Sequence, residues 1–287
     1  MSVWRLRTRS LPLDRPYVMG IVNVTPDSFS DGGAFFLADA AVEHGVRLVE
    51  EGADILDIGG ESTRPQGAVP VSVDEESRRV LPVLRALRER LGDVPLSVDT
   101  VKSEVAAAAL VEGAEIVNDV SAFRLDPAMA EVCAERGAGV VLMHSRGSVS
   151  EMGTYLHAAY GDDPAGEVFA ELAERAANAE RMGVERDRIA LDPGVGFAKR
   201  SEHSLAVLAG LDRLVALGYP VVVGASRKRF VGELSGVADP RERVEGTIGA
   251  NVMALALGAR IFRVHDVRAA RRALDVAWGI ARTRGAA

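Results

Sequence analysis

The sequence has one cysteine, Cys133, among its 287 residues. A single cysteine excludes an intrachain disulfide and a cysteine-rich metal site, and it fits a protein of a reducing compartment. Basic residues are also in the minority, with 34 Lys and Arg against 41 Asp and Glu, so the formal net charge is −7. We therefore expect no binding of nucleic acid, which requires a basic surface.

Long apolar segments are absent as well. The longest, residues 248–257, contains Asn251 and is too short to span a bilayer. The N-terminal residues 2–7, SVWRLR, lack the apolar core of a secretory signal. The sequence thus predicts a soluble, cytoplasmic protein that makes no contact with membranes.

One pattern recurs along the chain: a helical segment, the pair Gly-Ala, one variable residue, and a short apolar run. The four clear copies begin at Gly52, Gly113, Gly137 and Gly258. Glycine suits the position just after a helix because it adopts positive φ without strain, and the β-branched run that follows predicts a strand. An opening run at 19–23 and looser copies at 95–99, 188–192 and 219–224 bring the predicted strands to eight.

Helical patterns fill the intervals between these strands. They cover residues 38–51, 73–90, 103–112, 127–136, 165–182, 204–217, 241–257 and 267–282. Eight strands alternating with eight helices predict an α/β fold, a single (β/α)8 TIM barrel. An open doubly wound sheet is the alternative, but no Gly-x-Gly-x-x-Gly follows the first strand. We expect one domain over residues 1–287, with residues 1–16 as an N-terminal extension.

Polar residues stand at the carboxyl ends of the predicted strands. They are Asn23, Asp57, Asp99, Asn118 with Asp119, His144, Asp192, Ser226, and Arg263 with His265. Any one of them alone is more simply explained as a cap or turn residue, as for Asp99 before the helix at 103–112. Together they indicate a site, because barrel enzymes build their active sites at this face.

The predicted lining carries charges of both signs. Asp99, Asp192 and Asn118 offer acceptors that suit a ring rich in N–H groups. Cationic donors that suit phosphate or carboxylate are Arg64, Lys228, Arg263 and His265. A helix starting near Asp266 would add free N–H groups for an anion. We therefore expect a polar heterocycle and an anionic group to bind together.

Three other segments are polar. Residues 60–67 form a long loop punctuated by Gly and Pro, which is typical of a lid. Residues 145–163 contain no metal-ligand spacing, so we expect a solvated loop there. The basic triplet at 227–229 could likewise be a solvated turn.

Seven motifs, in order along the chain, resemble those of the dihydropteroate synthase family. They are NVTPDSFSDGG at 23–33, DIGGESTRP at 57–65, SVDT at 97–100, ND at 118–119, DPGVGF at 192–197, SRK at 226–228 and RVH at 263–265. The first two are highly specific. The resemblance implies an enzyme of folate biosynthesis that condenses 6-hydroxymethyl-7,8-dihydropterin pyrophosphate with p-aminobenzoate, giving 7,8-dihydropteroate and pyrophosphate.

The resemblance also implies roles for individual residues. The pterin would contact Asp99, Asn118, Met143, Asp192 and Lys228, and the pyrophosphate would contact Asn23, Arg263 and His265. The p-aminobenzoate site, which sulfonamides also occupy in this family, would comprise Phe29, Thr63, Arg64, Pro65 and Phe197. The catalytic set would be Asp99, Asp192, Lys228, Arg263 and His265. Asn23 would ligate Mg²⁺ together with the pyrophosphate, and the family leads us to expect a homodimer.

The sequence departs from the family pattern in several places. Gln66 follows the Arg-Pro pair where Gly is usual, Ala198 replaces Gly before Lys199, and Ser204 replaces Asn. The segment at 145–148 reads unusually as SRGS. These differences concern loop geometry and substrate affinity rather than the core of the site.

Three other functions remain open. A pterin-dependent corrinoid methyltransferase would share the barrel and the pterin pocket, but it would not need Asn23, the Arg64 loop or the Arg-x-His motif. A non-catalytic pterin-binding paralogue is supported by the insertion of Gln66. A Schiff-base aldolase that uses Lys228 is the weakest, because the neighbouring arginines would already serve anion binding.

The loops at 23–33 and 62–67 lead to a prediction about binding order. Both are polar and broken by Gly or Pro, so neither buries enough apolar surface to fix itself. We expect them to close on the pterin, Mg²⁺ and pyrophosphate, so that p-aminobenzoate binds second.

Overall fold

The computed structural model describes residues 3–25, 34–61 and 71–283. Its main sheet has eight strands in the order β8-β7-β6-β5-β4-β3-β10-β9, all parallel. They are β3 (Tyr17–Asn23), β4 (Ile55–Gly59), β5 (Leu96–Asp99), β6 (Ile116–Asp119), β7 (Gly139–Met143), β8 (Ile189–Asp192), β9 (Val222–Val223) and β10 (Ile261–Val264). A parallel bridge between Leu191 and Val221 joins the two ends of the sheet. The sheet is a nearly closed barrel, and the predicted (β/α)8 fold is confirmed.

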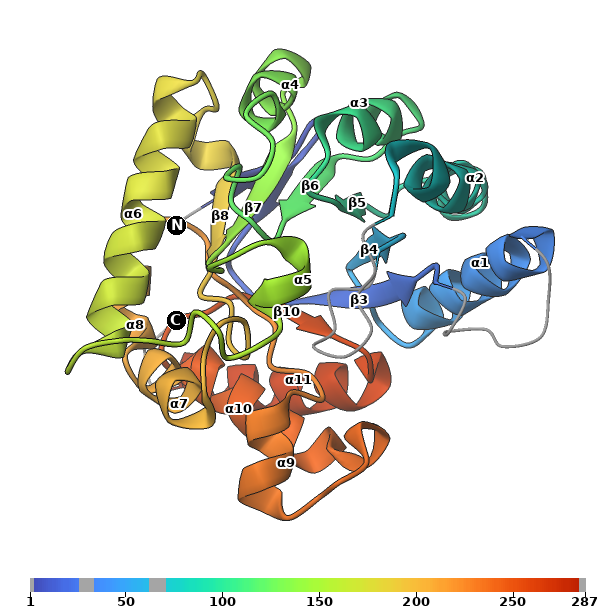
Figure 1. Ribbon diagram of the computed structural model, residues 1–287. Coiled ribbons are helices and arrows are strands. Elements are labelled where there is room, and N and C mark those ends of the chain that lie inside the picture. Colours follow the sequence, from blue (N-terminus) through green and yellow to red (C-terminus); the bar gives the residue numbers. More distant parts are fainter. Residues whose placement is uncertain (1–2, 26–33, 62–70, 284–287) are drawn as a thin grey trace.

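Helices surround the strands in chain order. They are α1 (Ala34–Glu50), α2 (Val73–Leu91), α3 (Ser103–Val111), α4 (Met129–Arg136), α5 (Val149–Met152), α6 (Pro164–Arg181), α7 (Ser201–Ala209), α8 (Leu211–Val215), α9 (Arg229–Ser235), α10 (Val244–Ala256) and α11 (Val267–Thr283), with 3₁₀ turns at Arg186–Arg188 and Pro240–Glu242. Figure 1 shows the ring that they form, from α1 in blue to α11 in red. None of the helices in the described ranges is long and apolar enough to cross a membrane.

The Gly-Ala pairs end helices as the sequence predicts. Their glycines have positive φ: 104° at Gly52, 102° at Gly113, 62° at Gly137 and 107° at Gly258. The N–H of the following alanine donates to the carbonyl five residues earlier, from Ala53 to Leu48, Ala114 to Ala109, Ala138 to Cys133 and Ala259 to Ala254, at 2.9 to 3.0 Å. This is the Schellman arrangement, which satisfies a carbonyl that the helix leaves free. One local pattern therefore stops four helices and starts four strands.

The N-terminal residues form the floor of the barrel. A small antiparallel hairpin, β1 (Val3–Arg5) and β2 (Ser10–Pro12), precedes the barrel. Trp4, Leu6 and Leu13 are buried against the inward-facing side chains of the barrel strands. The segment that the sequence identified only as an extension thus supplies apolar surface to the interior.

Some predicted elements differ from the structure. The helix expected at 204–217 is two helices, because the chain leaves helical geometry at Gly210, with φ −94° and ψ 16°. The prediction of a solvated loop at 145–163 is wrong in part, since this segment contains α5 and the fully buried Met152. Helix α9 was not predicted, because its seven residues are too few to display a 3.6-residue period.

Candidate active site

The inner face of the barrel changes from apolar to polar along the strands. The lower layer comprises Tyr17, Met19, Ile55, Ile116, Val141, Ala190, Val222 and Ile261, with Ser97 in β5. Side chains alternate across a strand, so residues two positions further along also point inward. Those residues are Ile21, Asp57, Asp99, Asn118, Met143, Asp192, Gly224 and Arg263. Five of the ten predicted strand-end residues thus belong to one layer of the barrel interior: Asp57, Asp99, Asn118, Asp192 and Arg263.

Arg263 links two carboxylates of this layer. Its Nε donates to Asp57 Oδ2 at 2.6 Å, and its Nη2 donates to Asp99 Oδ2 at 2.7 Å. The same Asp57 oxygen accepts a hydrogen bond from Asn118 Nδ2 at 3.0 Å. Asp57 is 0% exposed, and its Oδ1 has no hydrogen-bond partner in the described part of the chain. Asp57 therefore orients both Arg263 and Asn118, a role that the sequence did not assign to it.

Burial dominates the titration of these groups. It raises the pKa of Asp99 to about 7, although Arg263 acts in the opposite direction. Burial acts to lower the pKa of Arg263, but the charges of Asp57 and Asp99 outweigh it and raise that pKa. Burial, and next the charge of Arg263, lower the pKa of Lys228 to about 8. Such a concentration of perturbed groups is typical of a functional site.

Asp192, Phe197 and Lys228 meet on the other side of the layer. Asp192 ends β8, and its Oδ1 accepts a hydrogen bond from the N–H of Gly194 at 2.7 Å. Burial raises the pKa of Asp192, and the charge of Lys228 opposes this. Lys228 Nζ lies 3.8 Å from the centroid of the Phe197 ring, a cation–π contact. The structure therefore brings these three predicted residues together.

Ser226 and His265 contact each other after β9 and β10. Ser226 Oγ lies 3.0 Å from Nδ1 of His265 and accepts a hydrogen bond from its backbone N–H at 3.1 Å. Arg227 pairs with Asp266 through Nε at 3.0 Å and Nη2 at 2.6 Å. The basic triplet is thus not simply a solvated turn, because Arg227 is ion-paired while Lys228 faces the barrel.

Two of the strand-end residues face away from the barrel axis. Asp119 and His144 each follow an inward residue, Asn118 and Met143, by one position, so they point toward the helices. Asp119 accepts hydrogen bonds from backbone N–H groups of the next turn, including that of Ser121 at 2.6 Å. His144 contacts a carboxylate of α6 and a buried lysine. Both residues lie at the carboxyl ends of their strands, as predicted, but the two-residue alternation of the strands turns their side chains away from the site.

Asn23 and Met143 lie at the carboxyl ends of their strands. Asn23 ends β3, pairs in register with Gly59 of β4, and is partly exposed. Met143 ends β7 and packs with Val120 and Met152. Both positions agree with the face at which the sequence placed them.

Several predicted residues lie outside the described residues. These are Phe29, Thr63, Arg64, Pro65 and Gln66. Among the residues predicted to contact p-aminobenzoate, the structure describes Phe197 alone. The expected order of substrate binding, which depends on the loops at 23–33 and 62–67, stays a prediction.

Two departures from the family pattern lie in or beside the loop after β8, where Ala198 bonds through its backbone and Ser204 through its side chain. Ala198 has a φ of 48°, its N–H donates to the Met152 carbonyl at 2.6 Å, and its own carbonyl accepts from the Tyr160 hydroxyl at 3.1 Å. Ser204 Oγ accepts a hydrogen bond from the Gly196 N–H at 3.1 Å. Both residues thereby fix the loop that carries Phe197.

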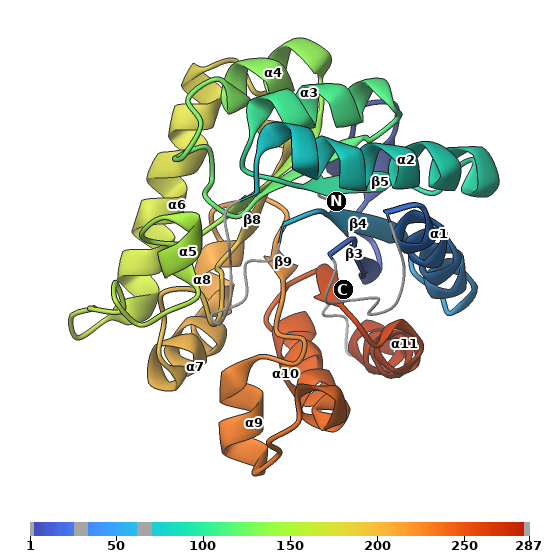
Figure 2. The same ribbon diagram turned by 45° about the vertical axis from the view of Figure 1, so that its right-hand side comes forward.

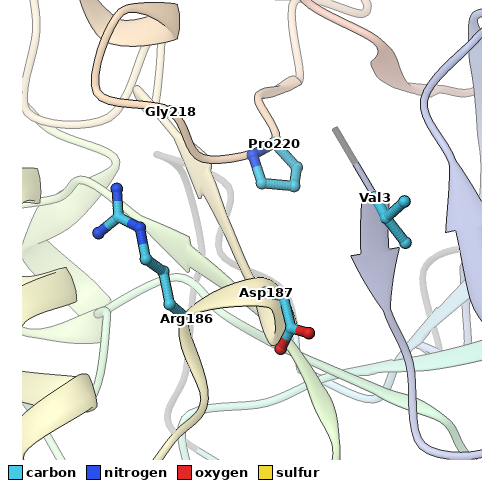
Figure 3. A pocket seen from close by; sticks show the side chains of 5 residues that line it. All are labelled: Val3, Arg186, Asp187, Gly218 and Pro220. Carbon is cyan, nitrogen blue, oxygen red and sulfur yellow. The ribbon is translucent and has the colours of Figure 1, made fainter. Parts of the chain in front are cut away.

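A hollow of about 320 Å³ lies at the opposite end of the barrel. Its lining, shown in Figure 3, is Val3, Arg186, Asp187, Gly218 and Pro220. The charged side chains are already paired, Arg186 with Glu180 at 2.9 Å and Asp187 with Arg5 at 3.3 Å. We assign no chemistry to this hollow, because its charges are neutralised and active sites of barrels lie at the carboxyl ends of strands.

The chain is similar to proteins of known function over nearly its whole length. Residues 19–265 match a family described as pterin binding enzyme. The dihydropteroate synthase of Synechocystis sp. is 45% identical over 263 residues, which are 92% of this chain and 89% of the relative. A Xanthomonas albilineans dihydropteroate synthase structure with 4-aminobenzoic acid has 48% identity and a TM-score of 0.89, covering 97% of both chains. The structure of the X. albilineans enzyme in complex with 7,8-dihydropteroate has 46% identity and a TM-score of 0.87, covering 97% of this chain and 98% of that one.

Proposed function

We infer, because the chain belongs to the pterin binding enzyme family, that it is a dihydropteroate synthase. It condenses 6-hydroxymethyl-7,8-dihydropterin pyrophosphate with p-aminobenzoate and releases pyrophosphate. The observation that carries this conclusion is the inward-facing polar layer, in which the partly exposed Arg263 bridges the fully buried Asp57 and the partly exposed Asp99. A single layer that holds acceptors and a cation largely removed from water suits a heterocycle with an anionic substituent.

We propose that the pterin ring binds within this layer. The acceptor oxygens of Asp99, Asn118 and Asp192 match the N–H donors of the ring, and the ammonium of Lys228 matches its acceptor atoms. Met143, buried at the end of β7, would pack on the ring face. Ring donors that meet these acceptors in a buried place would be recognised specifically, since an unpaired buried polar group is costly.

Arg263 and His265 would hold the pyrophosphate. Both precede α11, whose first N–H groups also favour an anion. Arg263 Nη2 donates to Asp99, while Nε donates to Asp57. We propose that substrate breaks the bond between Arg263 and Asp99. The Asp99 carboxylate would then accept a hydrogen bond from the pterin ring, and the guanidinium would donate to a phosphate oxygen. The bond from Nε to Asp57 would remain.

In the reaction, the bond between the pterin methylene carbon and the pyrophosphate oxygen breaks, and its electron pair leaves with pyrophosphate. The amine nitrogen of p-aminobenzoate then forms the new bond to the methylene carbon and loses a proton to solvent. Asp99 and Asp192 would favour the positive charge that develops on the pterin, and Arg263 and His265 would stabilise the leaving group. The attacking amine is neutral at pH 7, so it needs no activating base.

Asn23 fits the role of one ligand to Mg²⁺. Its amide is partly exposed at the end of β3, and the described residues contain no group of three or more His, Cys, Asp or Glu that could hold a metal ion. Mg²⁺ commonly keeps several waters and binds through substrate phosphates, so a single protein ligand is sufficient. We propose that Asn23 holds Mg²⁺ together with the pyrophosphate, where the ion would neutralise phosphate charge.

The p-aminobenzoate site would consist of Phe197 together with residues of the two loops. We keep Phe29, Thr63, Arg64 and Pro65 as proposed contacts on the family pattern alone. Sulfonamides resemble p-aminobenzoate, and we propose that they compete for the same place.

Measurement of pyrophosphate release tests the proposed function. With both substrates and Mg²⁺, we expect release that depends on p-aminobenzoate. A non-catalytic pterin-binding paralogue would bind the pterin without releasing pyrophosphate, and a methyltransferase would not depend on p-aminobenzoate. Neither alternative is favoured, because dihydropteroate synthases match nearly the whole chain.

We further propose a homodimer that forms through the last helices. Figures 1 and 2 show α10 and α11 side by side at the edge of the molecule. Three of their apolar side chains are well exposed: Met253, Val276 and Ile280.

We also propose that residues 1–287 act as one domain in the cytoplasm. The free, buried Cys133 is compatible with that reducing compartment.

A further inference from the structure

Lys199 is a buried lysine that none of the proposed substrate contacts uses. It stands between the loop that follows β8 and helix α7, and it is only 1% exposed. Its Nζ lies 2.8 Å from Nδ1 of His144, 3.1 Å from the carbonyl oxygen of Gly194 and 3.1 Å from that of Phe197. A buried ammonium is costly unless its donors are satisfied, so this arrangement needs a physical explanation.

The contact of Nε2, the other ring nitrogen of His144, indicates where the protons of Lys199 and His144 lie. Nε2 lies 3.0 Å from a Glu171 oxygen. Burial acts to raise the pKa of Glu171, but hydrogen bonds from His144 and Arg146 outweigh it and lower this pKa to about 2. The carboxylate is therefore ionised and can only accept hydrogen bonds. Nε2 therefore carries a proton, and in a neutral imidazole Nδ1 then presents its lone pair to Lys199.

The three nearest neighbours of Nζ are acceptors under this assignment, and the carbonyl oxygen of His144, at 3.5 Å, is a more distant fourth. An ammonium has three N–H donors, one for each of the three nearest acceptors, whereas a neutral amine would turn its lone pair toward an acceptor. Burial, and next the charge of Lys199, lower the pKa of His144 to about 3, so the two groups are not charged together. The pair therefore carries one positive charge, which we place on Lys199 opposite Glu171.

Lys199 fixes the segment that carries Phe197. The two carbonyls that it binds, at Gly194 and Phe197, are the ends of a tight turn closed by the hydrogen bond from the Phe197 N–H to the Gly194 carbonyl at 3.0 Å. Asp192 is held separately, because the His144 N–H donates to its backbone carbonyl at 2.9 Å in the ladder between β7 and β8. Loss of the ammonium would thus affect the place of Phe197 more than that of Asp192.

The charged neighbours of the pair are themselves connected. Glu171 also accepts hydrogen bonds from Arg146 and from Arg175, the latter at 3.1 Å. Arg175 in turn donates to the Ser145 carbonyl at 3.0 Å. Burial lowers the pKa of Lys199 well below its usual value, and the charges of Arg175 and Arg146 add to this, whereas Asp192 and Glu171 act in the opposite direction and favour the ammonium. The hydrogen-bond network that holds the Phe197 turn therefore extends from the loop after β8 to helix α6.

We propose that Lys199 is a positioning residue for p-aminobenzoate: its buried ammonium, shared with His144, sets the turn that presents Phe197 to the second substrate. This proposal rests on the proposed function, because it takes Phe197 as part of the p-aminobenzoate site. Lys199 itself touches neither substrate.

Steady-state kinetics of Lys199→Met tests the proposal. We expect KM for p-aminobenzoate to rise about tenfold or more, with kcat and the affinity for pterin pyrophosphate changed less than about threefold. The double variant Lys199→Met/His144→Leu should show the same asymmetry with a more stable fold, since it removes both polar partners. Unchanged KM for p-aminobenzoate in a folded variant would overturn the proposal.

Arg188→Met is the matched control. Arg188 also donates to two backbone carbonyls, those of Leu6, at 2.7 Å, and of Gly137, but it lies at the amino end of β8. We expect it to lower stability while leaving KM for p-aminobenzoate unchanged. An equal rise of KM in this control would mean that general destabilisation, and not the Phe197 turn, causes the effect.

Nitrogen NMR of the wild-type protein, labelled in lysine and histidine, tests the charge state without any substitution. We expect a protonated Lys199 and a neutral His144 with its proton on Nε2. A neutral lysine beside a neutral imidazole protonated on Nδ1 would contradict the proposal. If wild-type protein releases no pyrophosphate, the proposed function fails by itself, whereas an active wild type with an unaffected variant refutes only the role of Lys199.

Discussion

Asp57, at the scale of single residues, makes the contacts that orient Arg263 and Asn118. We predict that Asp57→Asn weakens binding of pterin pyrophosphate by about 1–3 kcal/mol, because a charge-assisted bond to Arg263 is lost. Binding of hydroxymethyl pterin, which lacks the phosphates, should weaken less. Titration calorimetry with both ligands measures the difference.

Asp119→Asn is the control for this prediction. Asp119 is equally buried but faces the helices, where it accepts hydrogen bonds from backbone N–H groups. Its substitution should lower the free energy of unfolding and leave both affinities unchanged. Equal weakening of the two ligands by Asp57→Asn would contradict the orienting role.

The pKa values of Asp99 and Lys228 predict a narrow pH optimum. Burial raises the pKa of Asp99 to about 7, so its accepting, ionised form is gained as pH rises through that value. Burial lowers the pKa of Lys228 to about 8, so its charged form is lost above that value. We expect kcat/KM for the pterin substrate to rise near pH 7 and fall above pH 8, since this ratio reports on groups of the free enzyme.

Two substitutions test which residue causes the rise and which causes the fall of this pH profile. Asp99→Asn should lower activity and remove the rise near pH 7, and Lys228→Met should remove the fall above pH 8. A rise and a fall that persist unchanged in both variants would show that other groups control the profile.

At the scale of elements, the N-terminal hairpin closes the floor of the barrel. Trp4 is 0% exposed, and its Nε1 donates to the Arg188 carbonyl at 2.9 Å. We predict that Trp4→Ala lowers the free energy of unfolding by about 3–5 kcal/mol, as expected for a large core side chain. Denaturation by urea measures this loss, and Val3→Ala on the exposed face of the same hairpin is the control.

The same variant tests whether the N-terminal hairpin influences the polar layer of the site. Folded Trp4→Ala protein should keep the KM values of the wild type, because the polar layer lies above the apolar one. A large rise of KM at low denaturant would mean that the hairpin also shapes the site.

At the scale of the whole molecule, the exposed apolar side chains of α10 and α11 predict the oligomeric state. We expect the wild type to be a dimer in light scattering, and Ile280→Glu to be a monomer, because a buried unpaired charge opposes association. Leu156→Glu is the control, since Leu156 is also well exposed but lies far along the chain in the segment after β7. A monomeric wild type, or a dimeric Ile280→Glu variant, would contradict this interface.

The order of strands and helices could be predicted from the sequence, because the signals involved are local. The Gly-Ala pairs stop helices through the conformational freedom of one glycine, and hydrogen bonds within six residues complete the stop. The motifs at the strand ends also placed Asp99, Asn118, Asp192 and Arg263 at one face, since parallel strands in a barrel share a carboxyl end.

How those residues interact could not be predicted from the sequence, because their contacts form only in the folded chain. Arg263 pairs with Asp57 and Asp99 across 206 and 164 residues, and no local pattern encodes such a contact. The same holds for Lys199, to which the sequence assigned no role and which the structure buries against His144. Removal from water makes the charge of each group depend on its neighbours, so the titration of the site and the position of Phe197 arise only once the chain has folded.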